Sequence, residues 1–248
     1  MIQRLFLFTL LLSSLLAIDA ESLMQSGNRL YEQGEYEQAV REYEKILSAD
    51  IHSASLHYNA GCAYFNLKMY GQAILHFEKA NLLKPRDPDI EHNLKFARLF
   101  LKDRFDVPEP MPLVKWFRNA RSSLSLRELR NTEVFMFLLV VGLILAHRFL
   151  AGRMDMGLLN PLIIIALVLF ILTTGWLVDR SLIERSNHAV VLVKEMEITS
   201  APVPGSSTLF VIHEGSSGEI LNTTDSWYEI RLPDGKAGWI PHEAVGTF

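Results

Sequence analysis

Apolar positions follow three different patterns along the chain, and each pattern predicts a different kind of element. Residues 134–146 and 161–178 are apolar and carry no charged side chain, which is typical of long helices in lipid. From residue 189 onward, short β-rich runs alternate with turn residues, which predicts a small all-β region. Residues 87–103 place a single apolar face at helical spacing. That face consists of Ile90, Leu94, Ala97 and Leu101.

The helical region carries an internal repeat. A shift of 34 positions, from Gly27 to Gly61, superimposes small and aromatic residues on residues of the same kind. The other matched pairs are Tyr36/Tyr70, Gln38/Gln72, Ala39/Ala73 and Tyr43/Phe77. The pattern resembles the tetratricopeptide repeat, a pair of antiparallel helices with this period. In that arrangement the glycines and alanines let helices approach closely, and the aromatic rings fill the remaining space.

The repeats are few. Gly34 predicts a left-handed turn inside the first unit, and Pro85 ends the second. Residues 21–103 are therefore expected to form an all-α solenoid of two tetratricopeptide repeats plus a cap helix. Because such arrays need about three repeats to bury a continuous core, we expect a partner, the membrane or self-association to support this one.

The resemblance implies a binding groove along the concave face of the first helices, where relatives hold extended peptides. The positions that it places there are Asn28, Tyr31, Tyr58, Asn59, Cys62 and Asn93. Asparagine can donate to and accept from a peptide backbone at once. Met24, Asp89 and Asn93 stand where a clamp for a terminal carboxylate has basic residues, which argues against that ligand. The alternative is that the asparagines only cap or solvate the helices.

Residues 1–20 resemble a secretory signal peptide. Arg4 precedes an apolar run from Leu5 to Leu16, and residues 18–20 offer a cleavage site. An uncleaved anchor helix is the alternative. In both cases the following region is expected to leave the cytoplasm.

Residues 104–131 combine a Pro-rich linker with a basic amphipathic helix, and an ordinary surface helix is the alternative. Two transmembrane helices are expected at 132–151 and 160–178. Together with the signal, they predict a protein of the bacterial inner membrane whose two terminal domains are extracytoplasmic. The basic flank before the first span runs against the positive-inside tendency.

Residues 187–248 predict about five short strands. The order of their turns and aromatic residues resembles a bacterial SH3 domain, which implies a small all-β barrel. The Asp234-Gly235 turn between apolar alternations is a strong hairpin signal. The resemblance suggests a binding surface at Trp227, Tyr228 and Trp239, although the tryptophans could instead fill the core.

Composition excludes several functions. The net charge is −4, so a general attraction to nucleic acid is not expected. Cys62 is the single cysteine, which excludes an intramolecular disulfide. Nucleophile-elbow, zinc-protease and phosphate-loop motifs are absent from the sequence, and the eight histidines lack metal-ligand spacing. We therefore expect no catalytic residue, metal or cofactor, and His57 and Cys62 are expected at the solenoid surface.

The order of the segments resembles the BatE family, from bacterial operons linked to aerotolerance. Residues 87–98, followed by the Pro-rich stretch and Trp116, also resemble that family. The resemblance implies a membrane scaffold that works with a MoxR-type ATPase and von Willebrand factor A-type membrane proteins. Alternatives are a sensor that holds cell-wall peptidoglycan through the SH3-like domain and an envelope enzyme.

Overall fold

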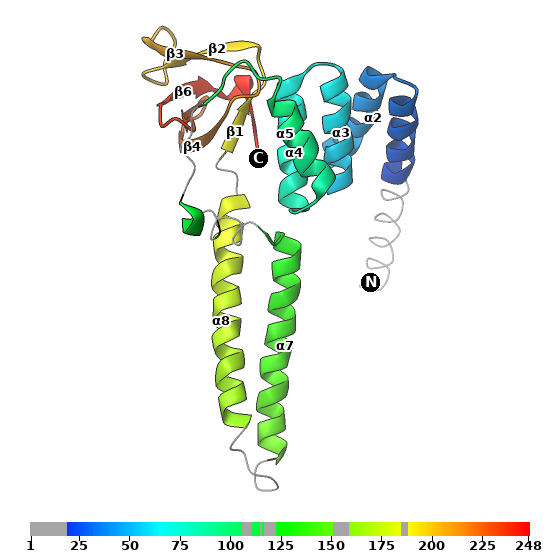
Figure 1. Ribbon diagram of the computed structural model, residues 1–248, viewed down its shortest axis with the longest axis vertical. Coiled ribbons are helices and arrows are strands. Elements are labelled where there is room, and N and C mark those ends of the chain that lie inside the picture. The colour runs from blue at the N-terminus through cyan, green and yellow to red at the C-terminus, as the bar shows by residue number, and fades with distance from the viewer. Residues whose placement is uncertain (1–18, 106–110, 115, 117–122, 151–158, 185–187) are drawn as a thin grey trace, which may run out of the picture. The chain divides into compact units, whose positions relative to one another are not determined.

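The computed structural model describes residues 19–105, 111–114, 116, 123–150, 159–184 and 188–248 (Figure 1). The chain forms two compact units: residues 1–107 with 187–248, and residues 108–186. The predicted signal peptide, apart from residues 19 and 20, lies outside the described residues, as do residues 106–110 of the Pro-rich linker.

The repeat region begins with a helix over residues 19–32, which we call the N-terminal helix. Four more helices follow it: α2 (Tyr36–Ser48), α3 (Ala54–Asn66), α4 (Tyr70–Leu83) and α5 (Pro88–Arg98). The Ser53 hydroxyl caps α3 by accepting from the Leu56 amide at 3.1 Å. Asp87 caps α5 by accepting from the amides of Asp89 and Ile90. Gly34 adopts φ +81° between the first two helices, which confirms the predicted left-handed turn.

The register derived from the 34-residue shift is confirmed by two equivalent contacts. A Cβ atom added to Gly27 would lie 2.5 Å from Tyr43 Cε1, and one added to Gly61 would lie 2.7 Å from Phe77 Cδ1. Tyr43 and Phe77 are both buried at 1% exposure. Each glycine therefore leaves room for the aromatic ring of its own repeat, and any larger residue would push the two helices apart.

The C-terminal region is one antiparallel sheet of seven strands. They are β1 (His188–Val191), β2 (Glu195–Thr199), β3 (Thr208–His213), β4 (Ser217–Thr223), β5 (Trp227–Arg231), β6 (Ala237–Pro241) and β7 (Val245–Thr247). Gly235 turns between β5 and β6 with φ +90°, as the hairpin signal predicts. Buried isoleucines form the core, among them Ile198, Ile230 and Ile240.

The sheet differs from the expected barrel. Its order is β3-β2-β6-β5-β4-β1-β7, so it is open, with β3 and β7 at its edges. Two strands were not predicted. β2 reads Glu-Met-Glu-Ile-Thr and is too polar to give a clear strand pattern, and β7 has only three residues. Strand patterns alone also do not determine whether a sheet closes.

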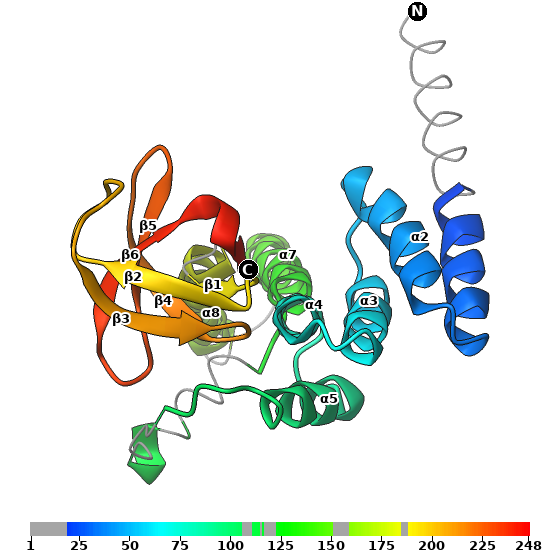
Figure 2. The ribbon, with the colours of Figure 1, turned by 90° about the horizontal axis from the view of Figure 1, so that it is seen from above.

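The sheet packs against the last complete repeat, with β1 beside α4 (Figure 2). Val190 of β1 belongs to the same apolar cluster as Leu75 and Phe77 of α4. Gly71 is needed at this contact, because an added Cβ would lie 2.5 Å from the carbonyl oxygen of Val191. The Gly71 amide also donates to Glu214 Oε1 at 2.8 Å. The support that a short repeat array needs thus comes from the chain's own C-terminal region.

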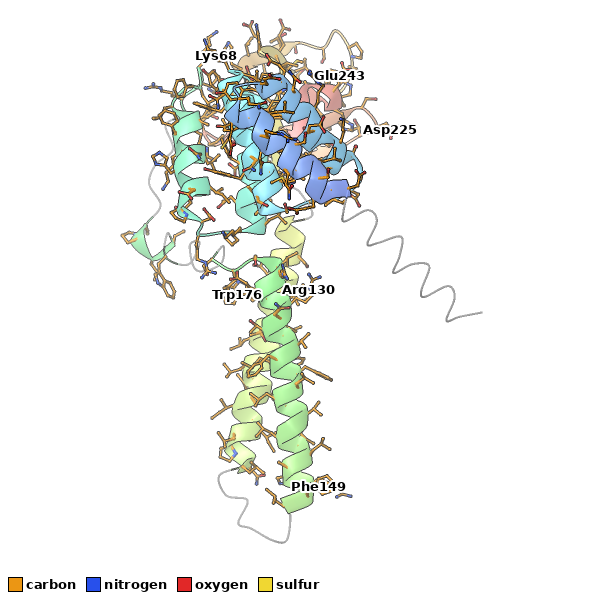
Figure 3. The ribbon with its side chains drawn as sticks, turned by 90° about the vertical axis from the view of Figure 1, so that its right-hand side faces the viewer. Lys68, Arg130, Phe149, Trp176, Asp225 and Glu243 are labelled. Carbon is orange, nitrogen blue, oxygen red and sulfur yellow. The ribbon has the colours of Figure 1, made fainter. Side chains whose placement is uncertain are left out.

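The second unit contains two long antiparallel helices, α7 (Leu126–Leu150) and α8 (Leu159–Glu184). Both are long and apolar enough to cross a membrane by length and composition. Arg130 and Trp176 lie toward one end of the pair and Phe149 lies at the other (Figure 3). Glu133 of α7 accepts hydrogen bonds from the hydroxyls of Thr173 and Thr174 on α8, which ties the two helices together.

The basic amphipathic helix predicted within residues 104–131 is only partly found, because residues 112–114 and 116 are helical but a break precedes α7. Residues 123–125 are not helical, and Ser125 and Glu128 form a reciprocal capping box. Arg127 and Arg130 therefore belong to the first turns of α7 rather than to a separate helix. Residues 115 and 117–122 of the expected helix lie outside the described part of the chain.

Candidate groove of the repeat region

The predicted groove residues come together on the inner face of the N-terminal helix, α3 and α5. A hollow of about 370 Å³ lies between the first two of these helices. Its lining consists of Asn28, Tyr31, Glu32, Tyr43, Tyr58, Asn59 and Cys62. A second hollow of about 280 Å³ adjoins it and is lined by Tyr31, Tyr58, Cys62, Phe65, Asn66, Phe77, Asn93 and Phe96. The two hollows share three residues, so they form one groove.

Side-chain amides link the helices across this groove. Asn28 Oδ1 accepts from Asn59 Nδ2 at 2.8 Å and from the Tyr43 hydroxyl at 2.9 Å. Asn93 Nδ2 donates to the Tyr58 hydroxyl at 2.6 Å. Each asparagine thus uses one end of its amide to hold a neighbouring helix. Among the described residues, the opposite ends, Asn28 Nδ2, Asn59 Oδ1 and Asn93 Oδ1, make no such bond and can face a ligand.

The groove keeps its hydroxyl and thiol groups neutral. Burial raises the pKa of Tyr43 to about 12 and that of Tyr58 to about 12. Burial likewise raises the pKa of the Cys62 thiol to about 11. A thiol with so high a pKa is a poor nucleophile, so Cys62 contributes a small apolar surface rather than reactivity.

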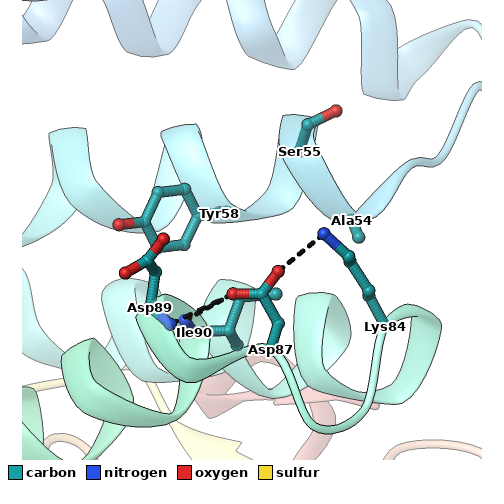
Figure 4. A pocket seen from close by; sticks show the side chains of 7 residues that line it. All are labelled: Ala54, Ser55, Tyr58, Lys84, Asp87, Asp89 and Ile90. Carbon is teal, nitrogen blue, oxygen red and sulfur yellow. Dashed lines mark hydrogen bonds and ion pairs between the residues drawn. The ribbon is translucent and has the colours of Figure 1, made fainter.

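A third hollow of about 330 Å³ continues the groove toward the start of α5 (Figure 4). It is lined by Ala54, Ser55, Tyr58, Lys84, Asp87, Asp89 and Ile90. Lys84 Nζ lies 2.7 Å from Asp87 Oδ2, and this ion pair raises the pKa of Lys84. Asp89 extends beside Tyr58 in Figure 4. Tyr58 therefore stands where all three hollows meet.

An aromatic cluster of Phe65, Tyr70, Phe96 and Phe100 lies at the other end of the groove. The ring centroids of Phe65 and Phe96 are 5.5 Å apart, and those of Tyr70 and Phe100 are 5.3 Å apart. Phe96 is 42% exposed and Phe100 is 47% exposed. Sequence reasoning missed this cluster, although Phe96 and Phe100 stand four positions apart within the helix predicted over residues 87–103, a spacing that could have signalled it.

A row of histidines, which sequence reasoning also missed, runs between the repeats. His57 Nε2 lies 3.1 Å from His52 Nδ1, and His57 Nδ1 lies 3.1 Å from His76 Nδ1. His76 Nε2 is 3.5 Å from Glu44 Oε1. His57 is 3% exposed, so its expected place at the solenoid surface is wrong. Within the described residues, no group of three or more histidine, cysteine, aspartate or glutamate side chains is arranged to hold a metal ion.

The three aromatic residues of the suggested SH3-like surface occupy two faces of the sheet. Trp227 pairs with Pro241, and Trp239 pairs with Glu229, so both tryptophans lie on one face of β5 and β6. Tyr228 lies on the other face, packs against the isoleucine core and stacks on His242. Both tryptophans are half-buried, and neither belongs to the buried core.

Comparison with known proteins supports the repeats. A TPR repeat family model matches residues 27–68, and a tetratricopeptide repeat family model matches residues 54–87. The chain is also similar to the BBSome complex member BBS4 of Bos taurus, with 29% identity over 82 residues. That match covers 33% of this chain and 16% of the relative. The N-terminal part of this chain therefore carries tetratricopeptide repeats.

Proposed function

We propose that this chain is a membrane-anchored scaffold of the bacterial cell envelope that captures extended segments of other proteins in the groove of its repeats. The observation that carries the proposal is the convergence of three hollows on Tyr58, with Asn59 and Asn93 beside it. An extended segment presents one backbone donor and one acceptor per residue. The open ends of the groove amides are of both kinds, so they can pair with such a backbone.

The anchoring part of the proposal rests on the helix pair. Arg130 and Trp176 lie toward the same end of the pair, which fits the preference of basic and aromatic side chains for the membrane–water interface. An antiparallel pair returns the chain to the side from which it came. The repeat and sheet regions flank the pair in sequence and pack together, so they must lie on the same side of the membrane. Two spans between them bring the chain back to that side.

The partners in this proposal are those that the resemblance to the BatE family implies. We propose a complex with a MoxR-type ATPase and von Willebrand factor A-type membrane proteins in the inner membrane, with the repeat and sheet regions outside the cytoplasm. The scaffold role does not require chemistry of its own, and the high pKa of Cys62 fits that view. We propose that the chain is not an enzyme.

The groove is tested directly by site-specific photocrosslinking in native membranes. A benzophenone amino acid replaces Tyr31 in the full-length chain, and a matched chain carries it in place of Lys45, which is exposed on α2 away from the three hollows. We expect a crosslinked partner band from position 31 and not from position 45. No band from position 31, or equal bands from both, would contradict the proposal.

A second candidate function uses the sheet. Trp227 and Trp239 lie on one face of β5 and β6 outside the core, as a binding surface of an SH3-like domain would require. We propose cell-wall peptide as the ligand of that surface. Sedimentation with purified peptidoglycan sacculi tests this. The wild-type chain should co-sediment, and a Trp227→Ala/Trp239→Ala chain should stay in solution.

A further inference from the structure

The groove is lined by more negative than positive side chains. The charged residues that line its three hollows are Glu32, Lys84, Asp87 and Asp89. Lys84 is already paired with Asp87, and Asp87 also caps α5. The charge of Asp89 also acts on Lys84, so this one cation faces two carboxylates at its end of the groove. The groove is therefore acidic, and an anionic ligand would meet repulsion in it.

The apolar surface of the groove is concentrated at one end. Cys62, Phe65, Phe77 and Phe96 line the second hollow, and Phe96 connects it to the exposed aromatic cluster. Burial of a large apolar side chain there would stabilise a complex, because apolar surface leaves water. A partially exposed group of aromatic rings at the end of a hollow is the kind of surface that anchors a binding partner.

The acidic end of the groove at Asp89 and its aromatic end at Phe96 lie at a defined spacing, because both residues belong to α5. Asp89, Asn93 and Phe96 are separated by four and then three positions, so they share one face of this helix. Asp89 and Phe96 lie seven positions apart, which corresponds to about 10 Å along a helix. An extended chain covers that length in about three residues. Tyr58, which lines the hollows at both ends, lies between them.

We propose that the groove selects extended segments that carry a lysine or arginine three residues away from a large apolar side chain. The cation lies against Asp89, the apolar side chain enters the hollow beside Phe96, and Asn93 pairs with the backbone between them. This inference rests on the proposed function, since it names the ligand class of the same groove. Charge complementarity and the spacing on α5 are its two independent supports.

Fluorescence anisotropy with the detergent-solubilised full-length chain tests the selection. The probe is a labelled peptide Gly-Ser-Lys-Ser-Gly-Phe-Ser-Gly, and the comparison peptides replace its Lys with Glu, replace its Phe with Ser, or move its Phe next to its Lys. We expect each change to weaken binding at least fivefold. Added salt should weaken binding of the probe. It should leave binding of a peptide with norleucine in place of Lys unaffected.

Two variants of the chain locate the effect. Asp89→Asn should lower the affinity for the lysine-containing probe about fivefold, as loss of a solvent-facing ion pair predicts. Glu91→Gln removes the same charge from the same helix away from the shared face, so it should leave the affinity unchanged. Equal or tighter binding of the glutamate peptide, or equal effects of the two variants, would overturn the selection rule.

The crosslinking and peptide-binding results together distinguish failure of the selection rule from failure of the proposed function. If position 31 crosslinks to a partner whose captured segment lacks a cationic and apolar pair at this spacing, the groove binds proteins and the selection rule is wrong. If position 31 captures nothing and the lysine probe also fails to bind, both the function and the rule are contradicted.

Discussion

Asp103 Oδ1 lies 2.7 Å from His213 Nδ1, although the two residues are 110 positions apart. The other carboxylate oxygen of Asp103 accepts from the His213 amide at 2.7 Å and from the Ser216 hydroxyl at 2.6 Å. Burial alone would raise the pKa of Asp103, but these hydrogen bonds outweigh it and lower the pKa. One carboxylate thus joins the end of the repeat region to the sheet.

Replacing Asp103 should loosen that joint. Asp103→Ala leaves the His213 amide and the Ser216 hydroxyl without their acceptor, and unsatisfied groups of this kind cost about 1–3 kcal/mol. We expect a lower midpoint of thermal unfolding for the full-length chain. Asp225→Ala, at an exposed aspartate of the same sheet region, should change little. An Asp103→Ala chain that unfolds at the wild-type temperature would show that the joint contributes no stability.

Acid should destabilise the repeats through His57. Its pKa is lowered to about 3, because burial disfavours the imidazolium ion and because His76, Lys79 and His52 add repulsion. Glu44 opposes them. The unfolded chain takes up a proton at this position below about pH 6.5, whereas the folded chain does not. The contribution of neutral His57 to the free energy of unfolding is therefore complete above pH 6.5. It is lost as the pH falls toward 3, by at most about 1.4 kcal/mol per pH unit.

Denaturant unfolding at pH 7.5 and pH 5.0 measures the effect. The wild-type chain should lose stability at the lower pH, and His57→Phe should lose less because no proton is taken up at that position. His92→Gln removes an exposed histidine and should behave as the wild type does. The same acid loss in His57→Phe and in the wild type would assign the pH dependence to other groups.

Lys68 is a position where we expect a glycine to stabilise the fold. It adopts φ +60° after α3, and the 34-residue shift makes it the equivalent of Gly34. A left-handed backbone costs a residue with a side chain about 1–2 kcal/mol. We therefore expect Lys68→Gly to raise the free energy of unfolding by about 1 kcal/mol. Lys95→Gly, within α5, should lower it by a similar amount. A Lys68→Gly chain that is destabilised as Lys95→Gly is would contradict the backbone argument.

The topology can be read from single cysteines in a Cys62→Ala chain. Arg41→Cys places a thiol on the repeat region, and Asp225→Cys places one on the sheet region. Arg153→Cys falls, in sequence, between the two long helices. A maleimide that cannot cross membranes should label the first two in spheroplasts and the third only after lysis. If only Arg153→Cys is labelled before lysis, the orientation is the reverse of the one proposed.

The repeat register could be predicted because small and aromatic residues recur at the same positions. Gly27 with Tyr43 and Gly61 with Phe77 are two copies of one contact, and the same period determines which side chains face the groove. The capping box of Ser125 and Glu128 was also readable, but the basic residues around it suggested one continuous helix.

The long-range polar contacts could not be predicted in this way. Asp103 and His213 come from distant segments and follow no periodic pattern. The contact between His57 and His76 likewise joins two helices and follows no periodic pattern. Strand pairing, and hence the openness of the sheet, depends on partners that a linear pattern does not specify.

The central claim concerns where the partners bind, and the asparagines of the groove decide it. Asn28, Asn59 and Asn93 lie on successive first helices and offer the open ends of their amides to a ligand. Losing hydrogen bonds to a desolvated backbone costs about 1–3 kcal/mol each. Deleting the sheet would be a poor comparison, because Val190 packs against α4. Trp227→Ala/Trp239→Ala is the matched control.

The measurement is co-purification of partners from detergent-solubilised membranes with wild-type, triple-alanine and double-tryptophan chains, after thermal unfolding has confirmed that all three are folded. The account predicts at least a tenfold loss of partners for the Asn28→Ala/Asn59→Ala/Asn93→Ala chain and no loss for the tryptophan variant. Retention of partners by the triple-alanine chain together with their loss from the tryptophan variant would contradict it and move binding to the sheet.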